Sequence, residues 1–238
     1  MILFENVSAQ WTKNENTGYI SPWEIGFSSG VSSFVTSVNF NPGAPNKNIN
    51  YWNNNLNPGI GLSVLRNFSP AVGLEINWLN TRLTGKWNDN WPPLPISVGR
   101  ETPLTYNSQI NQFDLMIGIN LNQIMLPGDN EDVWHLFIKT GAGIADIHDN
   151  KKFYPGINYV RLSFPLDLGL SVSISKRMKF QIGSTLRFVN TDNLDGVHVT
   201  YTNLNGDTVT PTHILEIYNY TYLKLNYSLG NFVSSKYR

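Results

Sequence analysis

The stretch Arg161–Phe188 reads RLSFPLDLGLSVSISKRMKFQIGSTLRF, two runs of alternating residues joined by a short basic turn. In the first run, alternate positions from Leu162 to Ile174 are apolar, and the positions between them are small, polar or proline. A repeat of two residues is typical of β-strands. The fold class therefore depends on which row faces water and on what lies against the other row.

Composition excludes several classes of protein. The chain has 238 residues, 14 % of them charged, and no apolar run approaches the 18 or so residues of a transmembrane helix. Its 17 basic and 17 acidic residues leave no basic surface for phosphates, so we expect no nucleic acid as a partner. With 0 cysteines, neither disulfides nor a thiolate metal site can form, and we expect no cofactor.

Eight alternating runs cover most of the chain. They lie at about residues 22–34, 57–66, 71–83, 108–123, 133–145, 159–175, 179–189 and 214–229. The connections at 67–70, 124–132 and 176–178 are short, whereas those at 35–56, 84–107, 146–158 and 190–213 are long and polar. Short turns at one end and long loops at the other are typical of membrane β-barrels, with the turns periplasmic and the loops extracellular.

The two rows of each run differ in a way that indicates which one is enclosed. One row is apolar throughout, as in Phe113, Leu115 and Ile117, while the other mixes glycine with charged residues, as in Asp114 and Gly118. Glycine weakens a solvent-facing strand, but it makes room for large polar side chains inside a narrow barrel. The apolar row then faces outward, where a complete apolar circumference suits lipid and not water.

We therefore predict an all-β fold, an eight-stranded antiparallel transmembrane β-barrel spanning residues 18–238. Residues 1–17 are interpreted as a signal-peptide remnant or a disordered N-terminus. Aromatic residues near strand ends, among them Trp23, Tyr218, Tyr220, Tyr222 and Tyr227, are expected at the headgroup layers.

Charged residues of the inner row are expected to neutralise one another. A three-residue loop at 176–178 places Ser175 opposite Lys179, and it therefore places Asp167 opposite Arg187. We predict a structural ion-pair network in the lumen, because a charge enclosed alone would be costly. Its members are Glu24, Glu75, Asp114, Lys139, Asp167, Arg187 and Lys224. Pro165 is expected to cause a bulge or a change of register.

The pattern resembles the small eight-stranded outer-membrane barrels, the OmpA-like transmembrane fold, and more particularly those of Bacteroidota. The residues that carry this resemblance are Ser163–Leu170, the turn Ser175–Arg177 and the run Leu186–Val197. A similar strand, turn, strand and Thr-Asp-x-Leu-Asp ending occurs in the family that includes PorG, a partner of the type IX secretion ring. The PorG-like similarity covers about residues 160–197. It implies location in the bacterial outer membrane and a role in a protein complex.

Two kinds of chemistry have candidate residues. A lipid-modifying hydrolase needs a nucleophile, a base and an orienting group, and the histidines His135, His148, His198 and His213 are the possible bases. Nothing in the sequence brings a serine and an acid to any of them, so we expect no enzyme and no catalytic residue. Weak metal candidates are Asp146, His148, Asp192 and Asp195, but solvated loop residues are the favoured interpretation.

Two loop segments suggest surface structure. Asn205-Gly206 favours a β-hairpin beyond the membrane, and NINYWNNNLN at Asn48–Asn57 has a composition suited to docking on a protein or glycan.

The function we predict is that of a non-enzymatic accessory or structural subunit of an outer-membrane complex for secretion, barrel assembly or uptake. The expected partners are outer-membrane lipids and other outer-membrane or periplasmic proteins, with no small-molecule substrate. The alternatives are an outer-membrane lipid-modifying hydrolase and a soluble lipocalin-like ligand-binding barrel.

Overall fold

The computed structural model describes residues 23–39, 52–69, 71–87, 105–125, 134–149, 159–175, 177–191, 194, 201–202, 208–209 and 214–229. The strands are β1 (Trp23–Asn39), β2 (Trp52–Asn54), β3 (Asn57–Asn67), β4 (Val72–Trp87), β5 (Thr105–Asn120), β6 (Trp134–Asp149), β7 (Tyr159–Ser173), β8 (Met178–Val189), β9 (Tyr201–Thr202), β10 (Thr208–Val209) and β11 (Ile214–Ser228). The short helix α2 (Leu121–Met125) follows β5. None of the helical residues described here forms a segment with the length and apolar character of a membrane span.

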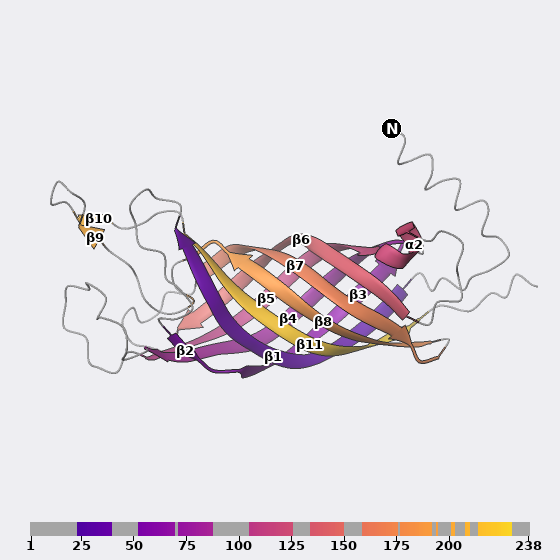
Figure 1. Cartoon of the computed structure of the whole chain (residues 1–238), viewed down its shortest axis with the longest axis horizontal. Helices are drawn as coiled ribbons and strands as arrows, with labels where there is room; N and C mark the ends of the chain where they lie inside the picture. The colour runs from indigo at the N-terminus through magenta and orange to yellow at the C-terminus, as the bar shows by residue number, and fades with distance from the viewer. Residues whose placement is uncertain are drawn as a thin grey trace, which may run out of the picture.

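Within these described segments, eight strands close into one antiparallel barrel. Strands β3 to β8 each pair with the next in chain order, and β1 joins β3 on one side and β11 on the other. β8 pairs with β11, which completes the ring. Figure 1 shows these long strands running obliquely to the long axis of the barrel. The predicted eight-stranded antiparallel barrel is therefore confirmed.

One end of the barrel carries the tight connections, and we call it the short-turn end. It holds the β3–β4 turn, where Phe68 and Ser69 donate from their backbone N–H groups to the carbonyl of Val72. It also holds α2 (Figure 1) and the junction at which Leu229 N–H donates to Trp23 O over 2.9 Å. The predicted strand through residue 123 is wrong at its end, because the Asn120 side chain accepts from Asn122 N–H and the chain turns into a helix.

The apolar row faces outward, as predicted. On β5, Leu115 and Ile117 are 51 % and 54 % exposed, whereas their neighbours Asp114 and Met116 are each 2 % exposed. The same alternation appears along β3, whose residues are buried and exposed in turn. The apolar side chains of the wall are therefore outside and the charged side chains are enclosed.

The register of the β7–β8 hairpin differs from the prediction by two residues. Ser173, not Ser175, lies opposite Lys179, because the turn comes earlier in the chain, with Ile174 N–H and Ser175 N–H both donating to Met178 O. Asp167 consequently faces Thr185, and the predicted pairing of Asp167 with Arg187 is wrong. A slip of two residues leaves each side chain on its own face, so the alternation in the sequence could not detect it.

Pro165 causes no bulge, contrary to the expectation. Thr140 pairs with Leu166 and Gly143 pairs with Ser163, so the β6–β7 register is the same on both sides of the proline. The Thr140 hydroxyl donates to Pro165 O over 3.1 Å and thus adds a bond where the proline has no N–H to give.

The long-loop half of the lumen is lined mainly by apolar residues, and the buried carboxylate of Glu216 accepts there from Leu194 N–H. We call the following buried residues the apolar layer: Phe34, Leu79, Leu83, Tyr106, Ile110, Ala145, Ile147, Val189, Leu194, Tyr218, Tyr220 and Tyr222. Three of them are the tyrosines expected at the headgroup layers, and that expectation is wrong, because Tyr218, Tyr220 and Tyr222 are at most 5 % exposed. Trp23 and Tyr227 do lie on the outer surface.

On β4, β5 and β6 the outward residues change from apolar to polar at the same level, whereas Val160 on β7, opposite Asp146, is apolar and 59 % exposed. On β4 the outward residues pass from Ile76 to the exposed Arg82 and Lys86. On β6 they pass from Ile144 to Asp146 and His148, whose side chains are 40 % and 37 % exposed. A barrel in water has apolar side chains inside and polar side chains outside. The strands thus extend past the bilayer, which needs about 9 to 11 residues per strand.

The predicted hairpin around Asn205-Gly206 is present as a separate element. β9 and β10 pair antiparallel, with Thr202 opposite Thr208, and lie apart from the barrel sheet (Figure 1). The turn residues themselves, and most of Asn48–Asn57, lie outside the described residues.

Candidate functional site

The structure places all seven predicted lumen charges inside the barrel, each at most 4 % exposed. The centre of the cluster is Glu75 on β4. Its two oxygens accept from Lys139 on β6 at 2.8 Å and from Lys224 on β11 at 2.6 Å. These contacts cross the lumen between strands that are not neighbours in the sheet, so one carboxylate neutralises cations from two other parts of the wall.

Asp167 completes this group without the partner predicted for it. It lies 3.8 Å from Lys139 and accepts from the Tyr222 hydroxyl at 2.7 Å and from Thr185 at 3.1 Å. Every polar contact of Asp167 therefore comes from another strand, and a carboxylate with several donors is tolerated in an enclosed site.

Arg187 pairs with Asp114 rather than with Asp167. Both are buried, and Asp114 also accepts from Gln112 at 2.6 Å and from Ser163 at 3.2 Å. Gln112 in turn accepts from the Tyr218 hydroxyl. This group connects the charged part of the lumen to the apolar layer.

The third group lies at the short-turn end around Glu24. Lys179 donates to Glu24 Oε1 at 2.6 Å, and Asn67 donates to the same oxygen at 3.0 Å. Lys179 was missed in the sequence analysis, although it shares the odd-numbered inner row of β8 with Arg187.

Glycines make the room for this packing, as inferred from the sequence. A Cβ added to Gly183 would lie 2.7 to 3.1 Å from atoms of the Tyr222 phenol. Because real side chains do not approach so closely, only glycine lets Tyr222 reach Asp167.

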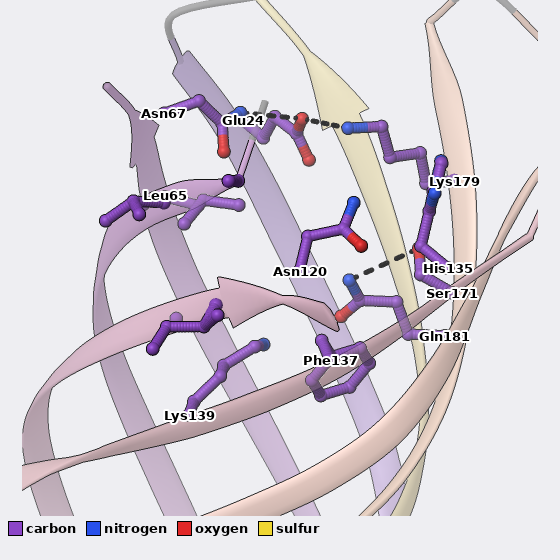
Figure 2. Close-up of a pocket in the computed structure, with 15 residues that line it drawn as sticks. Glu24, Leu65, Asn67, Asn120, His135, Phe137, Lys139, Ser171, Lys179 and Gln181 are labelled. Atoms are coloured by element: carbon purple, nitrogen blue, oxygen red, sulfur yellow. Dashed lines mark hydrogen bonds and ion pairs between the residues drawn. The ribbon is translucent and has the colours of Figure 1, made fainter. Parts of the chain in front are cut away.

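A pocket of about 100 Å³ opens beside the Glu24 group (Figure 2). Its lining comes from β1 and from β3 to β8: Glu24, Leu65, Asn67, Ala71, Val72, Gly73, Gly118, Ile119, Asn120, His135, Phe137, Lys139, Ser171, Lys179 and Gln181. Figure 2 shows the Glu24–Lys179 ion pair above Asn120, and the Gln181–Ser171 hydrogen bond below it.

The histidines and metal candidates are only partly brought together. His135 lies in the pocket opposite Ser171 in the β6–β7 pairing, while His148 is on the outer wall 3.5 Å from Asp146. Among the described residues, no group of three or more potential metal-ligating side chains occurs. Asp192, Asp195, His198 and His213 lie outside the described residues.

Comparison with known proteins supports the fold alone. No family model and no curated protein sequence matches the chain. The crystal structure of Neisserial surface protein A matches with a TM-score of 0.50 at 5 % identity, over 90 % of this chain and 100 % of that one. The outer membrane protein OprG from Pseudomonas aeruginosa matches with a TM-score of 0.44 at 11 % identity, over 88 % of this chain and 97 % of that one. The second match is too loose to support an argument.

The outer surface and the fold agree on location. A closed barrel whose apolar side chains are half exposed around its middle is stable in hydrocarbon, and barrels of this type belong to the bacterial outer membrane. The chain is therefore an outer-membrane β-barrel, and the soluble lipocalin-like alternative is set aside, because a lipocalin keeps its apolar rows inside.

Proposed function

We propose that the chain is a non-enzymatic accessory or structural subunit of an outer-membrane protein complex. The observation that carries this proposal is the filled lumen. The three ion groups occupy the middle and the short-turn end, and the apolar layer occupies the long-loop end. A lumen closed by these groups has no path for cargo. The protein then acts through contacts that its surfaces make with partner proteins.

Two surfaces are available for partners. The long-loop half of β4, β5 and β6 presents polar residues outside the bilayer, and the short-turn end presents exposed residues such as Arg177, whose guanidinium donates to the Tyr227 hydroxyl at 3.2 Å. The resemblance over residues 160–197 favours type IX secretion in a member of the Bacteroidota. Barrel assembly and nutrient uptake are variants of the same proposal.

Site-specific photo-crosslinking tests the proposal. A photoreactive residue is placed at Gln109 on the long-loop half, at Arg177 on the short-turn end, or at the lipid-facing Leu115 as a matched control. We expect a discrete crosslinked protein band from Gln109 or Arg177 in intact cells, and lipid adducts only from Leu115. Recovery of the chain alone from both surface positions would contradict the subunit proposal.

The non-enzymatic part of the proposal has its own test. His135 and Ser171 share the pocket, so His135→Ala is the most informative variant, with His148→Ala on the outer wall as its control. We expect unchanged lipid A composition in both. A loss of a lipid A modification in His135→Ala alone would make the chain a hydrolase.

A further inference from the structure

The pocket at the short-turn end is blind. Lys139 lies on its inner side with its ammonium held by Glu75, and the apolar layer lies beyond. A molecule that enters from the short-turn end can therefore bind but cannot pass through. The site is lined by buried and half-buried residues of the lumen and not by the exposed residues assigned to partner proteins, so what it holds is a separate question.

Two buried oxygens in the lining accept no hydrogen bond from any residue that the structure describes. They are Glu24 Oε2 and Gln181 Oε1. Glu24 is 1 % exposed and Gln181 is 6 % exposed. Burying an acceptor without a donor is costly, and native proteins rarely leave such atoms unsatisfied. Both oxygens line one pocket, and Figure 2 shows the Asn120 side chain between Glu24 and Gln181.

The charges of the lining limit what that molecule can be. Glu24 is already neutralised by Lys179, and Lys139 is neutralised by Glu75. A bare metal cation would have to lie close to the Lys179 ammonium and to gather about six oxygens. Lys179 itself is 34 % exposed at the side chain, which leaves it open to an anionic group. The wall thus offers acceptors and a cation together, with no net charge.

The size of the pocket fits a small molecule. About 100 Å³ is room for several waters, or for one molecule with a similar number of heavy atoms. Phe137 and Leu65 provide apolar contact for a short carbon skeleton. We propose that this pocket binds a small zwitterion of amino-acid size. Its ammonium group donates to Glu24 Oε2, and its carboxylate faces Lys179.

Titration of the full chain in detergent micelles tests the proposal. Glycine, alanine and β-alanine are the zwitterionic probes, and acetate and methylammonium carry one charged group each. We expect at least one zwitterion to bind about tenfold more tightly than either fragment, because only the zwitterion satisfies both ends of the site.

Variants identify the site. Glu24→Gln should weaken zwitterion binding about tenfold, because it removes the carboxylate that accepts from the ammonium group. Glu216→Gln is the matched control, since Glu216 is also fully buried in the barrel but pairs with Leu194 N–H at the other end. It should leave binding unchanged. Heat-modifiable migration on a gel verifies that each variant is folded.

Three results would overturn the proposal. The first is failure of all three zwitterions to bind the unaltered protein. The second is binding that is equally strong in Glu24→Gln, or equally strong for acetate. The third needs no variant: a crystal grown with glycine that shows only water against Glu24.

Discussion

The two halves of the barrel place apolar and polar residues on opposite sides of the wall. Over the bilayer half, the outside is apolar and the inside is built from ion groups around Glu75, Asp114 and Glu24. Over the long-loop half, the inside is the apolar layer and the outward positions of β4, β5 and β6 become polar. The alternation of the strands is continuous through both halves. What changes is the solvent outside, and the inside changes with it.

This difference teaches what an enclosed charge requires. In the bilayer half the wall faces hydrocarbon, so charges are tolerated only in the lumen and only with partners. In the long-loop half the wall faces water, so the ordinary rule for soluble proteins returns and apolar side chains form the core. The predictions below separate these two kinds of interior.

The largest effect is expected from Glu75→Gln. The amide keeps the size of the side chain but leaves Lys139 and Lys224 buried without their shared carboxylate. Removing one partner of a buried ion pair costs about 3 to 5 kcal/mol. Urea unfolding in lipid vesicles measures this loss in the free energy of unfolding. Arg82→Gln also removes one charge, but from an exposed position, and should stay within about 0.5 kcal/mol. Equal losses would mean that the ion group contributes no more than a surface charge.

In the apolar layer, the free energy of unfolding should depend on side-chain volume and not on charge. Leu79→Ala empties space at a residue that is 0 % exposed, and we expect a loss of about 3 kcal/mol. Leu62→Ala makes the same truncation at a residue 53 % exposed on the outer face, where lipid fills the space. It should lower the free energy of unfolding by about 1 kcal/mol, because the truncation removes only a few methylene groups from lipid. The same unfolding experiment compares them, and a larger loss for Leu62→Ala would reverse the assignment of the two faces.

The contact between the two halves is tested by Gly183→Ala. The added methyl group meets the Tyr222 ring, and overpacking of this kind costs about 1 to 3 kcal/mol. Gly118→Ala is the control, because its Cβ would meet the Lys139 side chain at 3.3 Å and would approach backbone no closer than Gly73 O at 3.9 Å. That substitution should be close to neutral. If both glycines tolerate alanine, the lumen is less densely packed than described.

The smallest effect is expected from Tyr222→Phe. Tyr222 belongs to the apolar layer, yet its hydroxyl donates to Asp167 in the ion group. Deleting one hydrogen bond to a carboxylate that keeps Lys139 and Thr185 should cost about 1 to 2 kcal/mol. A double-mutant cycle with Asp167→Asn measures the coupling between the two residues, and additivity of the two losses would show that this bond does not link the halves.

Much of the wall could be predicted from the sequence because period-two alternation is local. Leu115 and Asp114 are adjacent, and their opposite faces follow from strand geometry alone. The membership of the inner row follows in the same way, which is why Glu75 and Lys224 could be placed in the lumen before their partners were known.

The partners could not be predicted, because they depend on geometry that no single strand contains. Arg187 reaches Asp114 across the lumen, a contact set by the tilt and stagger of the closed sheet. The turn after Ser173 set the register two residues from the prediction. The apolar layer left a signal that was not used: Leu79 and Leu83 on β4 make the inner row apolar where the outer row becomes polar.

The central claim is that β4, β5 and β6 exchange the polarity of their outward and inward residues between the two halves, and spin labels along β5 test it most directly. The chain has 0 cysteines, so each introduced cysteine carries the only label. For labels at Leu115 and Ile117 in lipid vesicles, we expect rapid relaxation by oxygen and protection from a water-soluble reagent. For labels at Asn107 and Gln109, we expect the reverse. Contact with oxygen and protection from water at all four positions, or contact with neither reagent at Leu115 and Ile117, would contradict the account.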